Sequence, residues 1–359
     1  MVPNKSLIFT AVPTHTPVPG EHITLEDRPF DPSQRPPQHG ITAKTLWISL
    51  DPYMRGRMRP ASTASYSPAF TLGAPLTAYA LVQVLASDAD ADAEEAASFH
   101  PGDIIYGQFP VAEYSAISRE MLARPVVRKV HRLDGPAPLS PWLSVLGSTG
   151  LTAYSSLYKI GVPKPGETIF VSSAAGAVGL FVGQIARIEG LTVIGSVGDD
   201  AKLRFIRDSG FHDGFNYKKE RTADALKRLA PHGIDIYYDN VGGEQLEAAL
   251  EAMNDFGRIV VCGMISQYNK PAAEQYAVKG LTNILFKRLK IQGFVVTDPE
   301  FFKYREERDE KMIQWLKEGK MKNIEHVTEG IENAADAFVA MLEGSKAFGK
   351  ALLKVADPE

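Results

Sequence analysis

A glycine-rich run lies where a predicted strand passes into a predicted helix, an arrangement that suits phosphate binding. Residues 168–171 (TIFV) are apolar and β-prone, and 172–179 (SSAAGAVG) follow them directly. Aligned to G-x-G-x-x-G, the run places Ala174, Gly176 and Gly179 at the glycine positions. The pattern gives a tight turn, a close backbone approach to a pyrophosphate, and free helix N–H groups that bind it. We predict a dinucleotide site here; the alternative is a glycine turn that only packs a helix.

The residues after the second predicted strand indicate which dinucleotide is bound. A site for NAD usually carries Asp or Glu about twenty residues beyond the glycines, for the ribose 2′-hydroxyl. Residues 194–198 (IGSVG) hold no acid, and Asp199 and Asp200 are placed as N-terminal residues of a helix. Lys202 could reach a 2′-phosphate as a point charge. The pattern favours NADP(H) over NAD(H), with an exposed helix lysine as the alternative interpretation of Lys202.

Other catalytic patterns are missing from the sequence. The chain has one cysteine, Cys262, and its eight histidines form no H-x-H or H-E-x-x-H pattern. A G-x-S-x-G nucleophile elbow and a Walker phosphate loop are also missing. We therefore expect no metal site, and we expect hydride chemistry that depends on cofactor placement and hydroxyl hydrogen bonds.

The elements that would position these residues fall into three zones. Residues 1 to about 140 are rich in proline and short β-prone runs, which predicts an all-β or barrel-like unit. From there to 316, strands alternate with helices, which predicts a doubly wound parallel sheet. The last forty residues return to a mixed pattern with a helix over 334–342 and a strand over 351–355. The predicted elements of the middle zone are strands at 168–171, 191–194, 234–238 and 258–262, and helices at 177–189, 199–209 and 244–253.

Composition limits the partners and the compartment. A chain of 359 residues suits two domains. With 39 basic and 43 acidic residues, the formal net charge of −4 argues against nucleic acid or an anionic membrane as a partner. One cysteine allows no intramolecular disulfide, and the start lacks a signal-peptide pattern, so we expect a cytoplasmic protein. The acidic stretch 86–98 is predicted to be a solvated loop, with a docking patch as the alternative.

Seven motifs, spread in order along nearly the whole chain, together resemble one family. It is the zinc-independent branch of the medium-chain dehydrogenase/reductases, which contains leukotriene hydroxydehydrogenase/prostaglandin reductase and the plant alkenal double-bond reductases. The motifs are 50–58 (LDPYMRGRM), 150–154 (GLTAY), 174–179 (AAGAVG), 215–218 (FNYK), 238–243 (YDNVGG), 262–269 (CGMISQYN) and 293–296 (GFVV).

The resemblance implies an α/β fold in two domains. A Rossmann-type doubly wound parallel sheet would span 143–316, and a GroES-like β-barrel-type catalytic domain would combine 1–142 with 317–359. The resemblance also implies a homodimer. From the residues themselves, only the run 258–265 bears on that point, as either an edge strand or an interior strand.

The resemblance also implies roles for individual residues. Gly176 to Gly179 would hold the pyrophosphate, and Lys202 with Tyr217 would hold the 2′-phosphate. Tyr268 would lie near the nicotinamide ribose and place or polarise the substrate, and Tyr53 would lie at the substrate cleft. Tyr217 as a capping aromatic and Tyr53 as core packing remain alternatives. The implied catalytic residues are Tyr268 and Tyr53; the implied cofactor-binding residues are Ala174, Gly176, Ala177, Val178, Gly179, Ser196, Lys202, Tyr217, Asn240, Cys262, Gly263, Ser266, Tyr268, Phe294, Val295 and Val296.

Two departures from the family pattern stand out. The family's C-terminal G-x-N-x-G-K has an asparagine that contacts the cofactor, whereas 346–350 (KAFGK) places Ala347 there. The loss of one neutral hydrogen bond costs about 1 kcal/mol, which weakens cofactor binding without abolishing it. The segment 67–79 lacks the usual glycine-rich strand entry, so substrate choice is expected to differ.

The sequence leads to one main functional hypothesis and two rivals. We expect an NADPH-dependent reductase that acts on the carbon–carbon double bond of an α,β-unsaturated ketone or aldehyde, with a small-molecule substrate and no metal. Its hydroxyl donors would stabilise charge on the carbonyl oxygen. An NADPH-dependent quinone reductase and a non-catalytic NADPH-binding protein are the alternatives.

Overall fold

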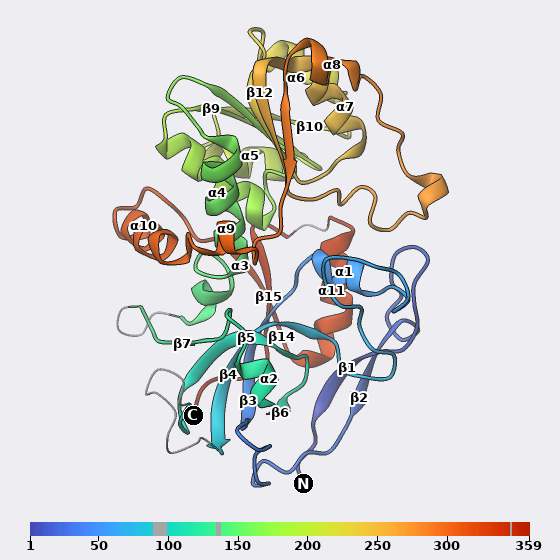
Figure 1. Cartoon of the computed structure of the whole chain (residues 1–359), viewed down its shortest axis with the longest axis vertical. Coiled ribbons are helices and arrows are strands. Elements are labelled where there is room, and N and C mark those ends of the chain that lie inside the picture. The colour runs from blue at the N-terminus through green and yellow to red at the C-terminus, as the bar shows by residue number, and fades with distance from the viewer. Residues whose placement is uncertain (89–98, 134–137, 345–346) are drawn as a thin grey trace. The chain divides into compact units, whose positions relative to one another are not determined.

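Two compact units make up the chain in the computed structural model, which describes residues 1–88, 99–133, 138–344 and 347–359 (Figure 1). The first unit comprises Met1–Leu143, His326–Ser345 and Ala351–Glu359. The second comprises Ser144–Glu325 and Lys346–Lys350. The domain limits expected from the sequence, 1–142 with 317–359 and 143–316, stay a prediction, and most of the acidic stretch 86–98 lies outside the described residues.

A six-stranded parallel sheet forms the centre of the second unit. Its strands run in the order β10-β9-β8-β11-β12-β13, which is the doubly wound Rossmann order with β8 as the first strand. The sheet therefore confirms the predicted doubly wound topology. The strands are β8 (Thr168–Val171), β9 (Thr192–Val197), β10 (Asp213–Asn216), β11 (Ile234–Asp239), β12 (Met253–Val261) and β13 (Lys290–Gly293).

Helices cover both faces of this sheet because its strands are apolar on both sides. On one face, Phe170 and Tyr237 pack with residues of α6 and α7. On the other, a side chain on Gly195 would touch Ile206 of α5, which shows how closely that helix approaches. The helices of this unit are α3 (Ser148–Ser156), α4 (Ala177–Ile188), α5 (Asp200–Asp208), α6 (Thr222–Leu229), α7 (Gly243–Ala252), α8 (Thr282–Phe286), α9 (Pro299–Phe302) and α10 (Arg305–Lys317).

The first unit is built on antiparallel strands, as the proline-rich, β-prone N-terminal zone predicts. Its sheet runs β14-β15-β3-β4-β5-β7, with β6 paired to β3, and β1 and β2 form a separate pair. The last strand of the chain, β15, pairs with β3, so the C-terminus completes this sheet. Its strands are β1 (Lys5–Phe9), β2 (Ile23–Asp27), β3 (Ile41–Ser49), β4 (Thr77–Ser87), β5 (Ile104–Pro110), β6 (Tyr114–Ile117), β7 (Arg128–Val130), β14 (Glu325–Glu329) and β15 (Lys350–Lys354); its helices are α1 (Tyr53–Arg57), α2 (Arg119–Leu122) and α11 (Ala334–Leu342).

The short helix α1 fixes the direction of Tyr53 in the first unit. Pro52 precedes the helix, and backbone N–H groups of Met54 and Arg55 donate to the carbonyls of Asp51 and Pro52, respectively. Met54 is fully buried in the core of the unit. Because Tyr53 and Arg57 are four residues apart on one helix, their side chains lie on the same face.

Two further findings bear on the predictions from the sequence. The run 258–265 begins in an interior strand, because β12 pairs with β11 on one side and with β13 on the other. Among the described helices, none has both the length and the apolar character needed to cross a membrane.

Candidate functional site

The turn from β8 to α4 leaves the start of that helix open to an anion. Ser173 adopts a left-handed backbone with φ of 52°, and Gly176 is the N-cap of α4. No side chain caps the helix there in the described structure. A Cβ on Gly179 would lie 2.4 Å from the Ser173 carbonyl oxygen, so only glycine allows this close turn. Ala177 and Val178, the first residues of α4, complete the turn.

The C-terminal segment that contains Ala347 lies against this turn. Gly349 N–H donates to the Ala175 carbonyl at 2.9 Å, and Gly349 forms an isolated parallel bridge with Gly176. The ring of Phe348 packs on that of Phe205 in α5, 4.9 Å between centroids. The substitution of alanine for the family's asparagine is therefore placed beside the dinucleotide turn.

Basic and aromatic side chains gather where β9 ends. Asp199 caps α5 by accepting the backbone N–H of Lys202 at 2.8 Å, as the sequence predicts. The Lys202 side chain is largely buried, and burial lowers the pKa of its ammonium group, an effect that Asp199 opposes and Lys218 reinforces. Tyr217 is half exposed, and its hydroxyl would lie 3.3 Å from a Cβ on Gly198.

Ser196, unlike Lys202 and Tyr217, points into the interior of the second unit. It is fully buried, and its hydroxyl donates to Gln245 Oε1 at 2.6 Å. Its carbonyl accepts the backbone N–H of Ala174 at 2.9 Å. Ser196 thus supports the glycine turn from beneath, and its predicted contact with cofactor stays a prediction.

The loop after β11 is organised by a buried carboxylate, Asp239. Its Oδ1 accepts the N–H groups of Val241 and Gly242 at 2.9 and 2.7 Å and the Tyr237 hydroxyl at 2.7 Å. Burial raises the pKa of Asp239, and these hydrogen bonds lower it. Gly242 takes a positive φ of 69° in this turn, a conformation that glycine adopts without strain. Asn240 donates from Nδ2 to the Ser172 carbonyl at 2.8 Å, so the ends of β8 and β11 are joined.

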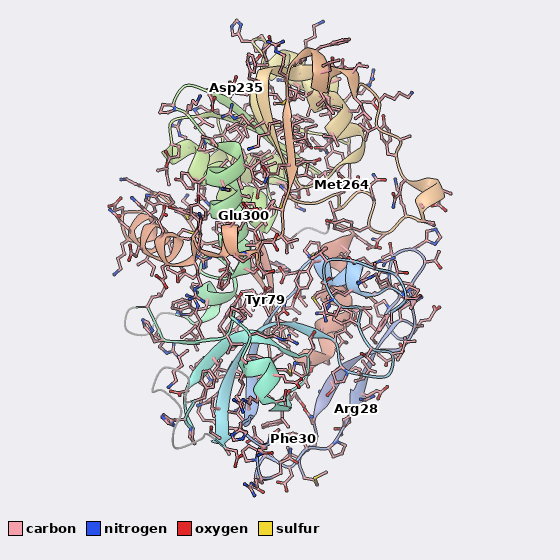
Figure 2. The ribbon with its side chains drawn as sticks, viewed as in Figure 1. Arg28, Phe30, Tyr79, Asp235, Met264 and Glu300 are labelled. Carbon is pink, nitrogen blue, oxygen red and sulfur yellow. The ribbon has the colours of Figure 1, made fainter. Side chains whose placement is uncertain are left out.

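The loop 262–268 is tied to the same edge of the sheet. Cys262 and Gly263 donate their N–H groups to the Asp239 carbonyl, and Ser266 donates its hydroxyl to the Val241 carbonyl at 2.6 Å. The Tyr268 hydroxyl accepts the N–H of Met264, which Figure 2 labels, at 3.1 Å. The carboxyl ends of three neighbouring strands therefore bring these predicted residues to one edge, where open α/β sheets bind ligands.

Two other predicted groups have distinct surroundings. Burial raises the pKa of the Cys262 thiol to about 12, so it stays protonated and is no nucleophile at neutral pH. The segment 294–296 follows β13 and is half buried, with the ring of Phe294 5.1 Å from that of Phe301. The Val295 carbonyl accepts the Asp298 N–H, which ends the segment in a turn, and Val296 lies inside that turn.

In the first unit, the Tyr53 hydroxyl is enclosed but has no hydrogen-bond partner among the described residues. Burial and the Asp51 carboxylate raise its pKa well above the usual value, and the Arg57 guanidinium lowers it. Arg57 donates to the Pro68 carbonyl and to Thr77, and its guanidinium also interacts electrostatically with Tyr53. A buried hydroxyl without a partner is costly, so this one is available to a ligand.

Three residues that position the predicted side chains, two in the first unit and one in the second, have no role in the sequence-based prediction. Tyr79, labelled in Figure 2, packs edge-on to Tyr53 with 6.2 Å between centroids. Asp239 organises the loop after β11, and Arg57 faces the Tyr53 hydroxyl. The spacing of Tyr53 and Arg57 on one helix could have revealed that pair, whereas Tyr79 lies on β4, far from α1 in the sequence, and leaves no local signal.

Two family models match separate parts of the chain. One, described as "Zinc-binding dehydrogenase", matches residues 177–318, and the other, "N-terminal domain of oxidoreductase", matches 8–124. Although the first description names zinc, the described residues contain no group of three or more His, Cys, Asp or Glu side chains that could hold a metal ion.

Similar proteins match over nearly the full length. "NADP-dependent oxidoreductase RED1" of Cochliobolus heterostrophus is 47% identical, with 99% of each chain covered. "2-alkenal reductase (NADP(+)-dependent)" of Nicotiana tabacum is 37% identical over 99% of this chain and 98% of its own. The crystal structure of CurA from Vibrio vulnificus in complex with NADPH is 32% identical, covers 99% of this chain and 100% of its own, and has a TM-score of 0.85. This likeness confirms the predicted combination of a Rossmann sheet with a GroES-like β unit.

Proposed function

Because this chain belongs to the medium-chain dehydrogenase/reductases, in the zinc-independent branch that contains the alkenal double-bond reductases, we propose that it reduces α,β-unsaturated ketones or aldehydes. It is an NADPH-dependent oxidoreductase. The observation that carries the finer proposal is the enclosed, unpartnered hydroxyl of Tyr53, a donor suited to a carbonyl oxygen.

The residues of the second unit fit NADPH. The open start of α4 and the close turn at Gly179 suit a pyrophosphate. Lys202, with Tyr217 beside the same strand end, would hold the 2′-phosphate; burial strengthens the attraction between an ammonium group and a dianion. Asn240, the loop 262–268 and the segment 294–296 would line the rest of the cofactor.

NADPH held by these residues would supply a hydride to the β-carbon of the substrate. As that bond forms, the double-bond electrons move onto the carbonyl oxygen, and a proton then adds to the α-carbon. Hydroxyl groups of Tyr268 and Tyr53 would donate to the carbonyl oxygen and stabilise its developing charge. Because its pKa is raised, Tyr53 stays protonated and remains a neutral donor at physiological pH.

A panel of enones, enals and quinones with NADPH tests this function. We expect NADPH consumption with enones or enals and recovery of the saturated carbonyl compound. A hydroquinone as the only product would identify a quinone reductase instead. Tight NADPH binding without turnover on any member of the panel would identify a binding protein that has lost catalysis.

We also propose that the protein is a cytoplasmic homodimer. β13 lies at the end of the sheet, and its described residues are mostly exposed. Large apolar side chains of the preceding helix, Leu285 and Phe286, are 74% and 65% exposed. An unpaired edge with exposed apolar neighbours favours pairing with a second copy of the chain.

A further inference from the structure

Asp239 is a fully buried carboxylate at the end of β11 that takes no part in the proposed reaction. Its side chain is 0% exposed, and Oδ2 has no hydrogen-bond partner among the described residues. Taking a carboxylate out of water costs free energy, which hydrogen bonds to one oxygen only partly offset. The contacts of this carboxylate therefore indicate what it does.

The carboxylate fixes the turn of residues 240–242. Its Oδ1 accepts the N–H groups of Val241 and Gly242 at 2.9 and 2.7 Å. A Cβ on Gly242 would lie 2.9 Å from Cγ of Met264, which belongs to the loop 262–268. The turn is therefore held by Asp239 on one side and lies closely against that loop on the other.

Backbone hydrogen bonds fasten the loop 262–268 to the same turn. The Asp239 carbonyl accepts the N–H groups of Cys262 and Gly263 at 2.9 and 3.0 Å. The next two carbonyls of the turn accept the N–H groups of Ile265 and Ser266, each at 3.2 Å. A shift of the turn would thus move the loop as well.

Asn240 is oriented through the same carboxylate. Its N–H donates to Ser172 Oγ at 2.9 Å, and its Nδ2 donates to the Ser172 carbonyl at 2.8 Å. Because Ser172 Oγ accepts that N–H, its own proton can point to Asp239 Oδ1, 3.4 Å away. The Tyr237 hydroxyl donates to the same Oδ1 at 2.7 Å. Together with the two N–H groups of the turn, these hydroxyls surround Oδ1 with donors.

Such donors favour the ionised form of the carboxylate. Burial raises the pKa of Asp239, and the hydrogen bonds from Gly242, Tyr237, Val241 and Ser172 lower it. The titratable side chains that interact with it are Tyr237 and Cys262, and burial raises the pKa of both, so both stay neutral. Acidification therefore changes the charge of this network at Asp239.

The strand order separates this network from the residues expected to hold the 2′-phosphate. The glycine turn follows β8, and Lys202 and Tyr217 follow β9 and β10, on one side of β8. Asp239 ends β11 and the loop 262–268 follows β12, on the other side. A dinucleotide binds across such a point in the sheet, with one half on each side. We therefore expect the network to support the half of NADPH that lacks the 2′-phosphate.

We infer that Asp239 is a positioning residue for the cofactor, whose ionised carboxylate holds the turn 240–242 and the loop 262–268 in the form that binds the nicotinamide half of NADPH. The inference requires that the chain binds NADP(H), and it is independent of the proposed substrate. Its test measures binding, so its failure is distinct from a failure to reduce enones.

Two aspartates on one strand provide a matched pair of variants. Asp239→Asn removes the charge and keeps the shape of the side chain. Asp235, labelled in Figure 2, lies at the amino end of β11, where its Oδ2 accepts the Thr168 N–H at 2.8 Å and its Oδ1 accepts Asn254 Nδ2 at 2.8 Å. Asp235→Asn therefore alters a similar acceptor of a backbone N–H, at the edge of the sheet opposite the candidate site.

We expect Asp239→Asn to raise the Kd values for NADPH and NADH by the same factor, about tenfold, because the 2′-phosphate is not involved. Asp235→Asn should leave both Kd values unchanged. Fluorescence titrations measure the constants, and circular dichroism checks that each variant is folded. Unchanged Kd values in Asp239→Asn, a rise for NADPH alone, or an equal rise in Asp235→Asn would overturn the inference.

The pH dependence of binding tests the ionised state, and it decides the matter if Asp239→Asn does not fold. Tyr237→Phe removes one donor from Oδ1 and keeps the stacking on Phe170. Titrations with NADP⁺, which is stable in acid, compare this variant with the wild type.

Since the lost donor stabilises the anion, Tyr237→Phe should lose affinity at a higher pH than the wild type as the solution is acidified. The 2′-phosphate titrates alike in both experiments and does not contribute to the difference. An identical pH profile, or a shift to lower pH, would overturn the inference, because a carboxylate that serves only the fold would not link Tyr237 to the pH dependence of binding.

Discussion

The Tyr53 hydroxyl combines a cost for the fold with a benefit for the proposed reaction. An enclosed hydroxyl without a partner destabilises the folded state by about 1–3 kcal/mol. We therefore expect Tyr53→Phe to raise the free energy of unfolding by about 1 kcal/mol. Because the carbonyl oxygen loses a donor, kcat should fall by roughly 10- to 100-fold. Urea unfolding and steady-state kinetics measure the two effects, with Tyr114→Phe as the control. A less stable variant with unchanged kcat would mean that Tyr53 is only a core residue.

We expect the affinity for NADPH to depend on the protonation state of Lys202. Its charged form would bind the 2′-phosphate, and burial lowers the pKa of this ammonium group. Lys202 therefore loses its proton at a lower pH than an exposed lysine. NADPH affinity should fall as the pH rises through that lowered pKa, while NADH affinity stays constant.

The substitution Lys202→Met should remove this pH dependence and weaken NADPH binding by roughly 10- to 100-fold, since a charge-assisted hydrogen bond contributes about 1.5–3 kcal/mol. Fluorescence titrations with both cofactors from neutral to alkaline pH measure it. Lys227→Met, which alters an exposed lysine on α6, is the control. NADPH binding that Lys202→Met leaves unchanged would show that other residues hold the 2′-phosphate.

At the scale of elements, a substitution in the segment 347–350 is expected to strengthen NADPH binding. It lies beside the start of α4, through the hydrogen bond from Gly349 to Ala175. Ala347→Asn would restore the side chain that the family uses at this position. One added neutral hydrogen bond of about 1 kcal/mol should lower the Kd for NADPH by roughly fivefold. An unchanged or higher Kd would show that the asparagine cannot reach the cofactor from this backbone.

The sequence predicts best those helices and strands that have a regular hydrophobic pattern and turn residues at both ends. The predicted β8 and α11 agree with the structure at both ends, because an apolar run or an amphipathic pattern has turn residues on either side. β12 begins at Met253, earlier than the sequence indicates. Its first part contains Phe256 with a positive φ of 60°, and the pairing with β11 shifts register there. A bulge stabilised by neighbouring strands leaves no local signal.

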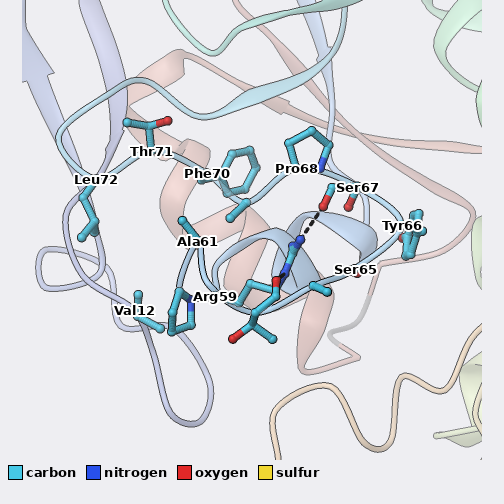
Figure 3. A pocket seen from close by; sticks show the side chains of 14 residues that line it. Val12, Arg59, Ala61, Ser65, Tyr66, Ser67, Pro68, Phe70, Thr71 and Leu72 are labelled. Atoms are coloured by element: carbon cyan, nitrogen blue, oxygen red, sulfur yellow. Dashed lines mark hydrogen bonds between the residues drawn. The ribbon is translucent and has the colours of Figure 1, made fainter.

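The candidate site residues also differ in whether neighbours in the sequence or distant residues determine their placement. The glycine turn and the cap at Asp199 follow from neighbouring residues, so the sequence predicts them. The inward direction of Ser196 depends on Gln245, which is 49 residues away. The shape of the loop 59–72 depends on Arg57 and Arg59, whose side chains donate to the Pro68 and Ser67 carbonyls; the bond from Arg59 is dashed in Figure 3. Such contacts are set by tertiary packing and are not encoded in a short motif.

At the scale of the whole molecule, the exposed edge at β13 predicts the oligomeric state. Light scattering should give about twice the 39.2 kDa of one chain. Leu285→Asp should shift the protein toward monomer, because a buried charge without a partner opposes association. Leu25→Asp, at an exposed apolar residue of β2, should not change the mass. A monomeric wild-type protein would contradict the dimer, and a Leu285→Asp variant that stays dimeric would place the interface elsewhere.

The transfer of a labelled hydride tests the central claim most directly. Wild-type protein is incubated with 4-phenyl-3-buten-2-one and, in separate reactions, with each of the two forms of NADPH that carry deuterium at nicotinamide C4. We predict that one form gives 4-phenyl-2-butanone with deuterium on the β-carbon, and that the new hydrogen on the α-carbon comes from solvent. Deuterium on the former carbonyl carbon of an allylic alcohol, or no transfer from either form, would contradict the proposed reduction of the carbon–carbon double bond.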